Sequence, residues 1–179
     1  MNIFLNYARA DQRQVEVVYE ILENMGFSPW MDTKDLIGGE DWEAGIENAI
    51  QRSDVFVPFL SRNSIKKRGV VQRELRIAFS KITDLLEDDI FILPVRLEDC
   101  DVPDRLARYQ WIDCGQPNWE SSFIRAIVEA RRRRDDGARS GLVFEQTFSL
   151  PVIIQDVTDE SEGKDISYQI PRVLGSVLT

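Results

Sequence analysis

The residues available for chemistry in this chain are mainly acidic. Its 179 residues include 31 aspartates and glutamates, 22 lysines and arginines, and no histidine. The lack of histidine excludes Ser-His and Cys-His nucleophilic pairs, acid–base catalysis by imidazole, and zinc held by histidine. The two cysteines, Cys100 and Cys114, lack the spacing of a metal site, and we expect them to be reduced thiols. The sequence therefore predicts no metal centre, and catalysis must use carboxylates, hydroxyls, thiols, amines or backbone groups.

Glu74 is the carboxylate whose position favours a functional role. It lies near the start of a segment in which apolar residues recur at helical spacing. These apolar residues are Val71, Leu75, Ala78, Phe79, Ile82 and Leu86. On a helical wheel, Glu74 falls at the margin of this stripe rather than in the middle of the polar face. The structural alternative is a solvated glutamate that pairs with Arg73 or Lys67.

Short apolar runs alternate with longer helical patterns along most of the chain. Strands are expected at 3–7, 28–31, 55–60, 90–95 and 109–112. Helices are expected at 12–25, 42–50, 71–86 and 118–134. Gly26 is expected to end the first helix in a left-handed conformation. This alternation predicts an α/β fold, namely a flavodoxin-like, doubly wound parallel sheet of five strands with helices on both faces.

In such folds, ligands bind beyond the carboxyl ends of the strands. The loops expected there are 8–11, 32–39, 61–69 and 96–105, and Glu74 lies just after the third. These loops contain neither a P-loop nor a dinucleotide-binding glycine fingerprint. A response-regulator receiver is also excluded, because its acidic residues are missing where the first and third strands end in Asn6-Tyr7 and Leu60-Ser61.

The charge of the chain limits its partners. Its formal net charge is −9, and an acidic surface repels phosphates, so we expect no nucleic-acid partner. No apolar run is long enough to cross a bilayer, and the first residues do not form a signal peptide. We therefore expect no membrane partner and a cytoplasmic location.

Four segments, in order, resemble the TIR (Toll/interleukin-1 receptor) domain family. Residues 4–11 (FLNYARAD) are similar to the end of the family's first strand, with Asn6 in place of the usual serine. Residues 32–54 resemble its BB loop and the helix that follows. Residues 59–75 (FLSRNSIKKRGVVQREL) resemble the bacterial form of the segment that ends in the family's glutamate, and residues 94–113 resemble the closing part. The resemblance covers residues 1–134.

The resemblance implies an enzyme that cleaves NAD⁺, with Glu74 as the catalytic carboxylate. The implied products are nicotinamide and either ADP-ribose or a cyclic isomer, with NAD⁺ as the substrate and no cofactor. The resemblance also implies self-association through TIR–TIR contacts and a role as a bacterial anti-phage effector. A second hypothesis is a non-catalytic TIR–TIR interaction module in signalling. Because both hypotheses use the same fold, the fold does not decide between them.

Further residues are predicted to contact the substrate at the ends of the first two strands. Tyr7, Ala8 and Arg9 leave the first strand at the crevice. Their backbone and the guanidinium of Arg9 are placed to meet phosphate or ribose, although Arg9 is equally well explained as a surface arginine. Asp32 and Leu36, in the segment that resembles the BB loop, are expected to border the nucleotide or a neighbouring TIR domain.

Three more candidates follow the later loops. Trp42 offers an aromatic face for a base or ribose, but its place at the head of an apolar stripe favours a core anchor. Ser61 is either a ligand contact or, as is common for serine, a cap or turn residue. Val70 stands where the family often has a tryptophan, four residues before its glutamate, so this position lacks a stacking surface.

The composition changes after Arg134. We expect a TIR domain at 1–134, a linker at 135–141 and a C-terminal extension at 142–179. The extension contains β-like runs at 148–154 and 166–170, and is expected to be a β-hairpin or the start of a further domain.

Overall fold

The computed structural model describes residues 1–39, 41–66, 70–82 and 90–138. Five parallel strands form one sheet in the order β2-β1-β3-β4-β5. They are β1 (Asn2–Asn6), β2 (Ser28–Trp30), β3 (Val55–Leu60), β4 (Val95–Arg96) and β5 (Ile112–Asp113). This arrangement confirms the predicted α/β fold and its five-stranded parallel sheet.

The helices lie between and after these strands. They are η1 (Arg9–Asp11), α1 (Gln12–Asn24), α2 (Asp32–Asp35), α3 (Trp42–Arg52), α4 (Arg62–Lys66), α5 (Val70–Lys81), α6 (Asp104–Ala107) and α7 (Trp119–Ala138). Gly26 follows α1 with a φ of 77°, as predicted for the end of this helix. Within the described residues, no helix has the length and apolar character needed to cross a membrane.

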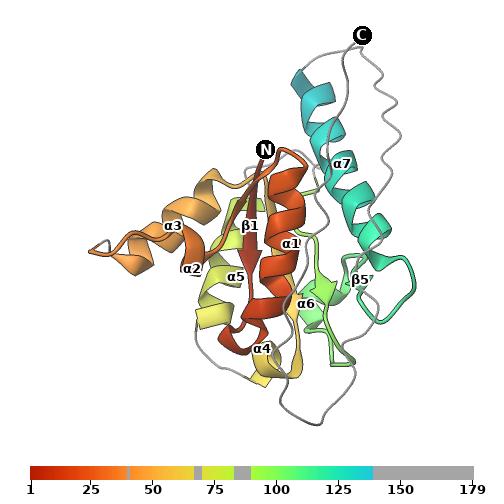
Figure 1. Ribbon diagram of the computed structural model, residues 1–179, viewed down its shortest axis with the longest axis horizontal. Helices are drawn as coiled ribbons and strands as arrows, with labels where there is room; N and C mark the ends of the chain where they lie inside the picture. Colours follow the sequence, from red (N-terminus) through yellow and green to blue (C-terminus); the bar gives the residue numbers. More distant parts are fainter. Residues whose placement is uncertain (40, 67–69, 83–89, 139–179) are drawn as a thin grey trace, which may run out of the picture. The chain divides into compact units, whose positions relative to one another are not determined.

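The sheet is covered by helices on both faces. On one face, the stacked rings of Phe4 and Phe56 pack with residues of α3, α5 and α6, such as Ile50 and Ala78. Side chains alternate along a strand, so Ile3 and Leu5 point to the other face. Helices α1 and α7 supply buried residues outside the first cluster (Val15, Val18 and Leu22 from α1; Phe123, Ile124 and Ile127 from α7). Figure 1 shows α1 beside β1, α7 near β5, and α3 and α5 on the side of β1 away from β5.

Two expected loops contain short helices, and the expected strand 90–95 is shortened. Helix α2 lies within the loop expected at 32–39, and α4 lies within that expected at 61–69. In the strand, Phe91 and Leu93 still exchange backbone hydrogen bonds with Phe56. Pro94 has no N–H to donate on the side of β5, and the regular strand β4 covers only Val95–Arg96.

Helix α7 continues through Ala138 and so enters the linker expected at 135–141. Ion pairs one helical turn apart support the extra turn, between Arg131 and Asp135 and between Arg132 and Asp136. Residues 135–138 are therefore helical. The division into domains stays a prediction, and the expected extension at 142–179 lies outside the described residues.

Candidate functional site

Glu74 is a buried carboxyl group on the second turn of α5. The residue is 7% exposed, and its Oε2 accepts a hydrogen bond from the side-chain amide of Asn6. Arg73, the neighbour that sequence analysis offered as an ion-pair partner, instead pairs with Glu43 of α3 at 2.7 Å. The alternative of a solvated glutamate paired with Arg73 is therefore wrong, because Glu74 is buried and Arg73 pairs with Glu43. Lys67, the other partner considered, lies outside the described residues.

Helical spacing and sheet order bring Asn6 and Glu74 together. Glu74 lies one turn before Ala78, so both side chains point from the same face of α5. Ala78 is fully buried in the core cluster, and this face is therefore turned toward the sheet. Asn6 is the last residue of β1, beside Pro58 of β3, where the carboxyl ends of the central strands meet. The site thus lies at the edge of the sheet where ligands bind in this class of fold.

The surroundings of Glu74 favour its neutral form. Burial, followed by the negative charge of Asp32, raises the pKa of Glu74 from 4.5 to about 8, and the charge of Arg73 opposes this shift. A carboxyl group with a pKa near neutrality can exchange protons at physiological pH. Glu74 therefore has the electrostatic character of a functional group rather than of a surface residue.

A second polar group lies around Asp32. Tyr7 donates its hydroxyl hydrogen to Asp32 Oδ1, and its Oη lies 3.1 Å from Thr33 Oγ1. Arg9 Nη1 lies 3.7 Å from Asp32 Oδ2, and the Arg9 side chain is 70% exposed. Burial and the contact with Asp32 raise the pKa of Tyr7, which keeps its hydroxyl protonated. The structure therefore brings Tyr7, Arg9 and Asp32 together. Asp32 is also close enough to Glu74 to raise the pKa of Glu74.

Glu74 lines a cavity of about 280 Å³ between α3 and α5. The other lining residues are Trp42, Glu43, Ile46, Arg73, Arg76 and Ile77. Trp42 is 50% exposed, so its expected role as a core anchor is wrong. Ile46 and Ile50, one and two turns further along α3, provide the buried stripe, whereas Trp42 stands at the first position of the helix. Its indole is available to a ligand as one wall of the Glu74 cavity.

Ser61 has the capping role that was the expected alternative to a ligand contact. Its Oγ donates to Asp11 Oδ2 at 2.5 Å and accepts from the backbone N–H groups of Asn63 and Ser64 at 3.1 Å. One donor and two acceptor positions are the full capacity of a hydroxyl group. Ser61 therefore caps α4 and ties it to η1.

Three other residues were expected to contact the substrate. Two of them, Ala8 and Leu36, do not line the Glu74 cavity, and the side chain of the third, Val70, is not described. Ala8 is 2% exposed, and its carbonyl accepts a hydrogen bond from the N–H of Asp11. Leu36 packs against the core cluster, where its Cδ2 occupies space that a side chain at Gly45 would need. Val70 begins α5, but its side chain is outside the described part of the structure.

A family model described as "TIR domain" matches residues 3–128. The chain belongs to the TIR domain family. This TIR domain is similar in structure to the TIR domain of the Toll-related receptor TRR-2 from Hydra magnipapillata. The TM-score is 0.61 at 21% identity, covering 73% of this chain and 97% of the other, and supports the shared fold.

Two further solved structures share a weaker likeness with this TIR domain. The TIR domains of the activated Roq1 resistosome recognising the effector XopQ match at 20% identity, with 76% of each chain covered and a TM-score of 0.47. The Clostridium botulinum CMP N-glycosidase BcmB matches at 17% identity, with 65% of this chain and 91% of the other covered and a TM-score of 0.45. No curated protein matches the chain.

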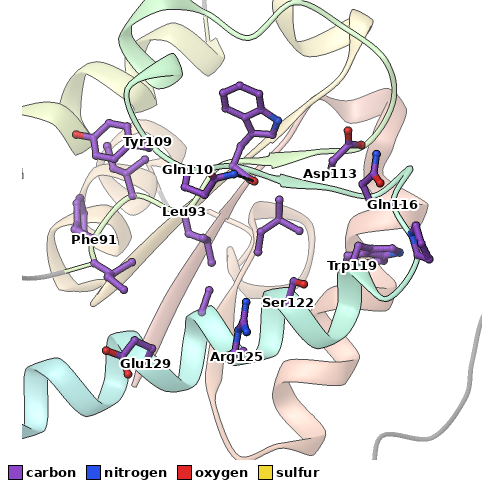
Figure 2. A pocket seen from close by; sticks show the side chains of 16 residues that line it. Phe91, Leu93, Tyr109, Gln110, Asp113, Gln116, Trp119, Ser122, Arg125 and Glu129 are labelled. Carbon is purple, nitrogen blue, oxygen red and sulfur yellow. Dashed lines mark hydrogen bonds between the residues drawn. The ribbon is translucent and has the colours of Figure 1, made fainter.

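A larger cleft of this TIR domain, of about 860 Å³, does not contain Glu74. Figure 2 shows it between the strand side, with Phe91, Leu93 and Tyr109, and helix α7, with Ser122 and Arg125. Its one α7 carboxylate, Glu129, forms ion pairs with arginines of the same helix. The cleft thus offers an apolar surface, whereas the smaller cavity holds the carboxylate with the perturbed pKa.

Two features of the site in this TIR domain were not predicted from the sequence. One is the hydrogen bond between Asn6 and Glu74, which are 68 positions apart. The available signal was a polar side chain at the end of an otherwise apolar strand. The other is the ion pair of Arg73 and Glu43, which links α5 to α3 across the cavity. Among the described residues, no group of three or more cysteine, aspartate or glutamate side chains is arranged to hold a metal ion.

Proposed function

We propose that this TIR domain cleaves the bond between nicotinamide and ribose in NAD⁺, with Glu74 as the catalytic carboxylate. The observation that carries the proposal is the buried carboxyl group in a cavity, with its pKa raised to about 8. A non-catalytic interaction module has no use for such a group, because a buried carboxyl destabilises the fold. At the same position, glutamine or leucine would avoid that destabilisation.

One carboxylate is sufficient for this reaction. Most glycosidases need a second acid to protonate the leaving oxygen. In NAD⁺ the nicotinamide is already a cation, and it takes the electrons of the C–N bond and leaves neutral without a proton. The Glu74 carboxylate then stabilises the cationic ribosyl centre. Water, or a nucleophilic atom of the substrate itself, forms the new bond to the ribose carbon and gives its proton to Glu74, which yields ADP-ribose or a cyclic isomer.

Binding of the substrate also favours the ionised form of Glu74. Opposite charges within a few ångströms stabilise the ionised form of a carboxyl group. The cationic nicotinamide ribosyl group therefore lowers the pKa of Glu74 when it binds. Binding of NAD⁺ is accompanied by loss of a proton from Glu74, and a neutral analogue lacks this effect.

Trp42 supplies the aromatic surface that Val70 does not. The indole lines the same cavity as Glu74 and is half exposed, so a flat ring can stack on it. Nicotinamide is an electron-poor aromatic cation and is suited to such a face. On this proposal, stacking comes from α3 rather than from the start of α5.

The remaining contacts fit the polar parts of the dinucleotide. Arg9 is 70% exposed near the carboxyl end of β1, where its guanidinium can bind phosphate. Asp32 is oriented by Tyr7 and Arg9, and its carboxylate can accept ribose hydroxyl groups. The cavity of about 280 Å³ is at the small end for a ligand site, so it takes the nicotinamide ribosyl end only.

We propose that self-association completes the site. Ile37, in the segment that resembles the BB loop, is 70% exposed, and the apolar cleft beside β5 is open. The two features lie toward opposite edges of the sheet, because β2 precedes one of them and β5 borders the other. Figure 1 shows α2 and α3 on one side of the view and β5 on the other. Insertion of Ile37 of one copy into the cleft of the next generates a head-to-tail row.

The resemblance to bacterial TIR domains extends the proposal to a role in defence. In that role, assembly during phage infection activates the domain, and cleavage depletes the cellular pool of NAD⁺. Measurement of NAD⁺ in infected bacteria that express this chain tests the role. Equal NAD⁺ loss with a Glu74→Gln variant would contradict it.

The direct test of the activity is release of nicotinamide. The purified chain is incubated with NAD⁺ over a wide range of protein concentration, with and without a crowding agent, and nicotinamide is measured by chromatography. We expect release that rises more steeply than in proportion to protein concentration. Absence of release under every assembly-promoting condition would refute the enzymatic proposal.

A further inference from the structure

A buried amide lies against the proposed catalytic carboxylate. Asn6 is 1% exposed, and its Nδ2 donates a hydrogen bond to Glu74 Oε2. Among the residues that the structure describes, Asn6 Oδ1 has no hydrogen-bond partner. A buried acceptor without a partner destabilises a fold, whereas an apolar side chain of the same size avoids that penalty. Packing alone therefore does not explain an asparagine at this position.

We propose that Asn6 is a positioning residue that serves both protonation states of Glu74: Nδ2 donates to the carboxylate, and Oδ1 accepts from the protonated carboxyl group. This inference rests on the proposed function and names a residue that controls its catalytic group. Asn6 acts through Glu74 and does not line the cavity.

The chemistry of the two side chains supports this pairing. An ionised carboxylate only accepts hydrogen bonds, whereas a protonated one also donates through its O–H. The asparagine amide carries a donor and an acceptor on one planar group, and rotation about its last side-chain bond exchanges them. Leucine, which has a similar shape, provides neither group. An unpartnered Oδ1 is therefore the acceptor that Glu74 needs in its neutral form.

Charged groups also surround Glu74, in addition to the neutral amide of Asn6. Asp32 of α2 raises the pKa of Glu74, and Arg73 of its own helix lowers it. Glu43 of α3 faces the same cavity and is paired with Arg73, and Arg76 of α5 also lines it. A hydrogen bond to the charged carboxylate is about twice as strong as one made with the neutral carboxyl group, so the net effect of Asn6 is to lower the pKa of Glu74, against burial and Asp32. Removal of the amide must move the titration of Glu74 to higher pH.

The test measures the titration of Glu74 with no substrate present. Protein labelled with ¹³C-glutamate is titrated by NMR, and the Glu74→Gln variant assigns the side-chain carboxyl resonance. Asn6→Leu and Asn6→Asp both remove the donor, and the second places another acid against Glu74. We expect the apparent pKa of Glu74 to rise by about one unit or more in each variant. Asn48→Leu, an identical replacement at an exposed position of α3, should leave it unchanged.

The pH–activity profile for nicotinamide release must move with the titration. In both Asn6 variants, the acidic limb shifts to higher pH by the same amount as the pKa of Glu74. A pKa within about 0.2 units of the wild-type value in the Asn6 variants that fold would overturn the inference. If the wild-type protein releases no nicotinamide, the proposed function fails, while the NMR titration still decides the role of Asn6.

Discussion

Trp42 and Glu74 line one cavity from two different helices, α3 and α5. The tryptophan is half exposed and the glutamate is 7% exposed, so an aromatic surface borders a buried acid. In the proposed reaction, this pairing places stacking and charge stabilisation at the same end of the substrate. The family often provides its tryptophan four residues before the glutamate, whereas this chain has Val70 at that position.

Replacement of Trp42 by leucine should weaken substrate binding more than it slows the bond-breaking step. Loss of stacking on one ring raises KM for NAD⁺ about tenfold, with a smaller effect on kcat. Trp42→Phe keeps an aromatic face and should stay closer to the wild type. Steady-state kinetics of nicotinamide release measure both constants. An unchanged KM in Trp42→Leu would remove the indole from the substrate site.

The pH dependence of kcat/KM should follow ionisation of Glu74 in the free enzyme. Because the pKa of Glu74 is raised to about 8, the carboxylate is a minor form at pH 6. We expect kcat/KM to rise about tenfold per pH unit below pH 8 and to level off above it. Initial rates at low NAD⁺ concentration, corrected for hydrolysis without enzyme, give the profile. A limb centred near pH 4.5 would mean that Glu74 titrates as an ordinary glutamate.

Glu74 should make the fold less stable as the pH rises. Its pKa is about 8 in the folded protein against an ordinary value of 4.5, so the folded state resists loss of the proton. The destabilisation is absent below pH 4.5, develops between pH 4.5 and 8, and reaches about 5 kcal/mol above pH 8. Glu74→Gln lacks this titration. Its free energy of unfolding in urea should match that of the wild type at pH 4 and exceed it at pH 8.

Glu23→Gln is the matched control for this comparison, because Glu23 is exposed on α1. It should follow the wild-type dependence on pH. A constant difference between Glu74→Gln and wild type at every pH would show that the Glu74 titration is not linked to folding.

Self-association should depend on Ile37 and on the cleft beside β5. An aspartate at position 37 places a charge in the apolar interface and should raise the protein concentration for half-maximal activity by about tenfold or more. Ala126→Trp, which fills the cleft from α7, should act in the same direction. Dilution series of nicotinamide release measure both effects. Unchanged concentration dependence in both variants would contradict this mode of assembly.

Much of the fold was predictable from local patterns in the chain. The apolar run 55–60 became a fully buried strand, and Gly26 ended α1 as its conformational freedom predicts. Short helices were not predictable in this way, because contacts distant in sequence stabilise them. The cap of α4, for example, depends on Ser61 and on Asp11, 50 residues away.

The site was predictable at Glu74 but not in its surroundings. Its place at the margin of an apolar stripe, together with the family resemblance, singled out the residue. The apolar stripe of α3 wrongly predicted that Trp42 is buried, because the first position of this helix lies past the edge of the core. Asp32 raises the pKa of Glu74 and Asn6 donates a hydrogen bond to it, and only the folded chain brings these residues near. A helical wheel contains no information about such contacts.

The measurement that tests the central claim most directly compares nicotinamide release by wild type, Glu74→Gln and Glu23→Gln. All three are assayed at the same high protein concentration, at pH 8 and with saturating NAD⁺, and far-UV spectra check that they are folded. We predict that Glu74→Gln loses at least about 99% of the activity, since Glu43, the other carboxylate that lines the cavity, is paired with Arg73. Glu23→Gln should retain full activity. A folded Glu74→Gln protein that releases nicotinamide at the wild-type rate would contradict the claim.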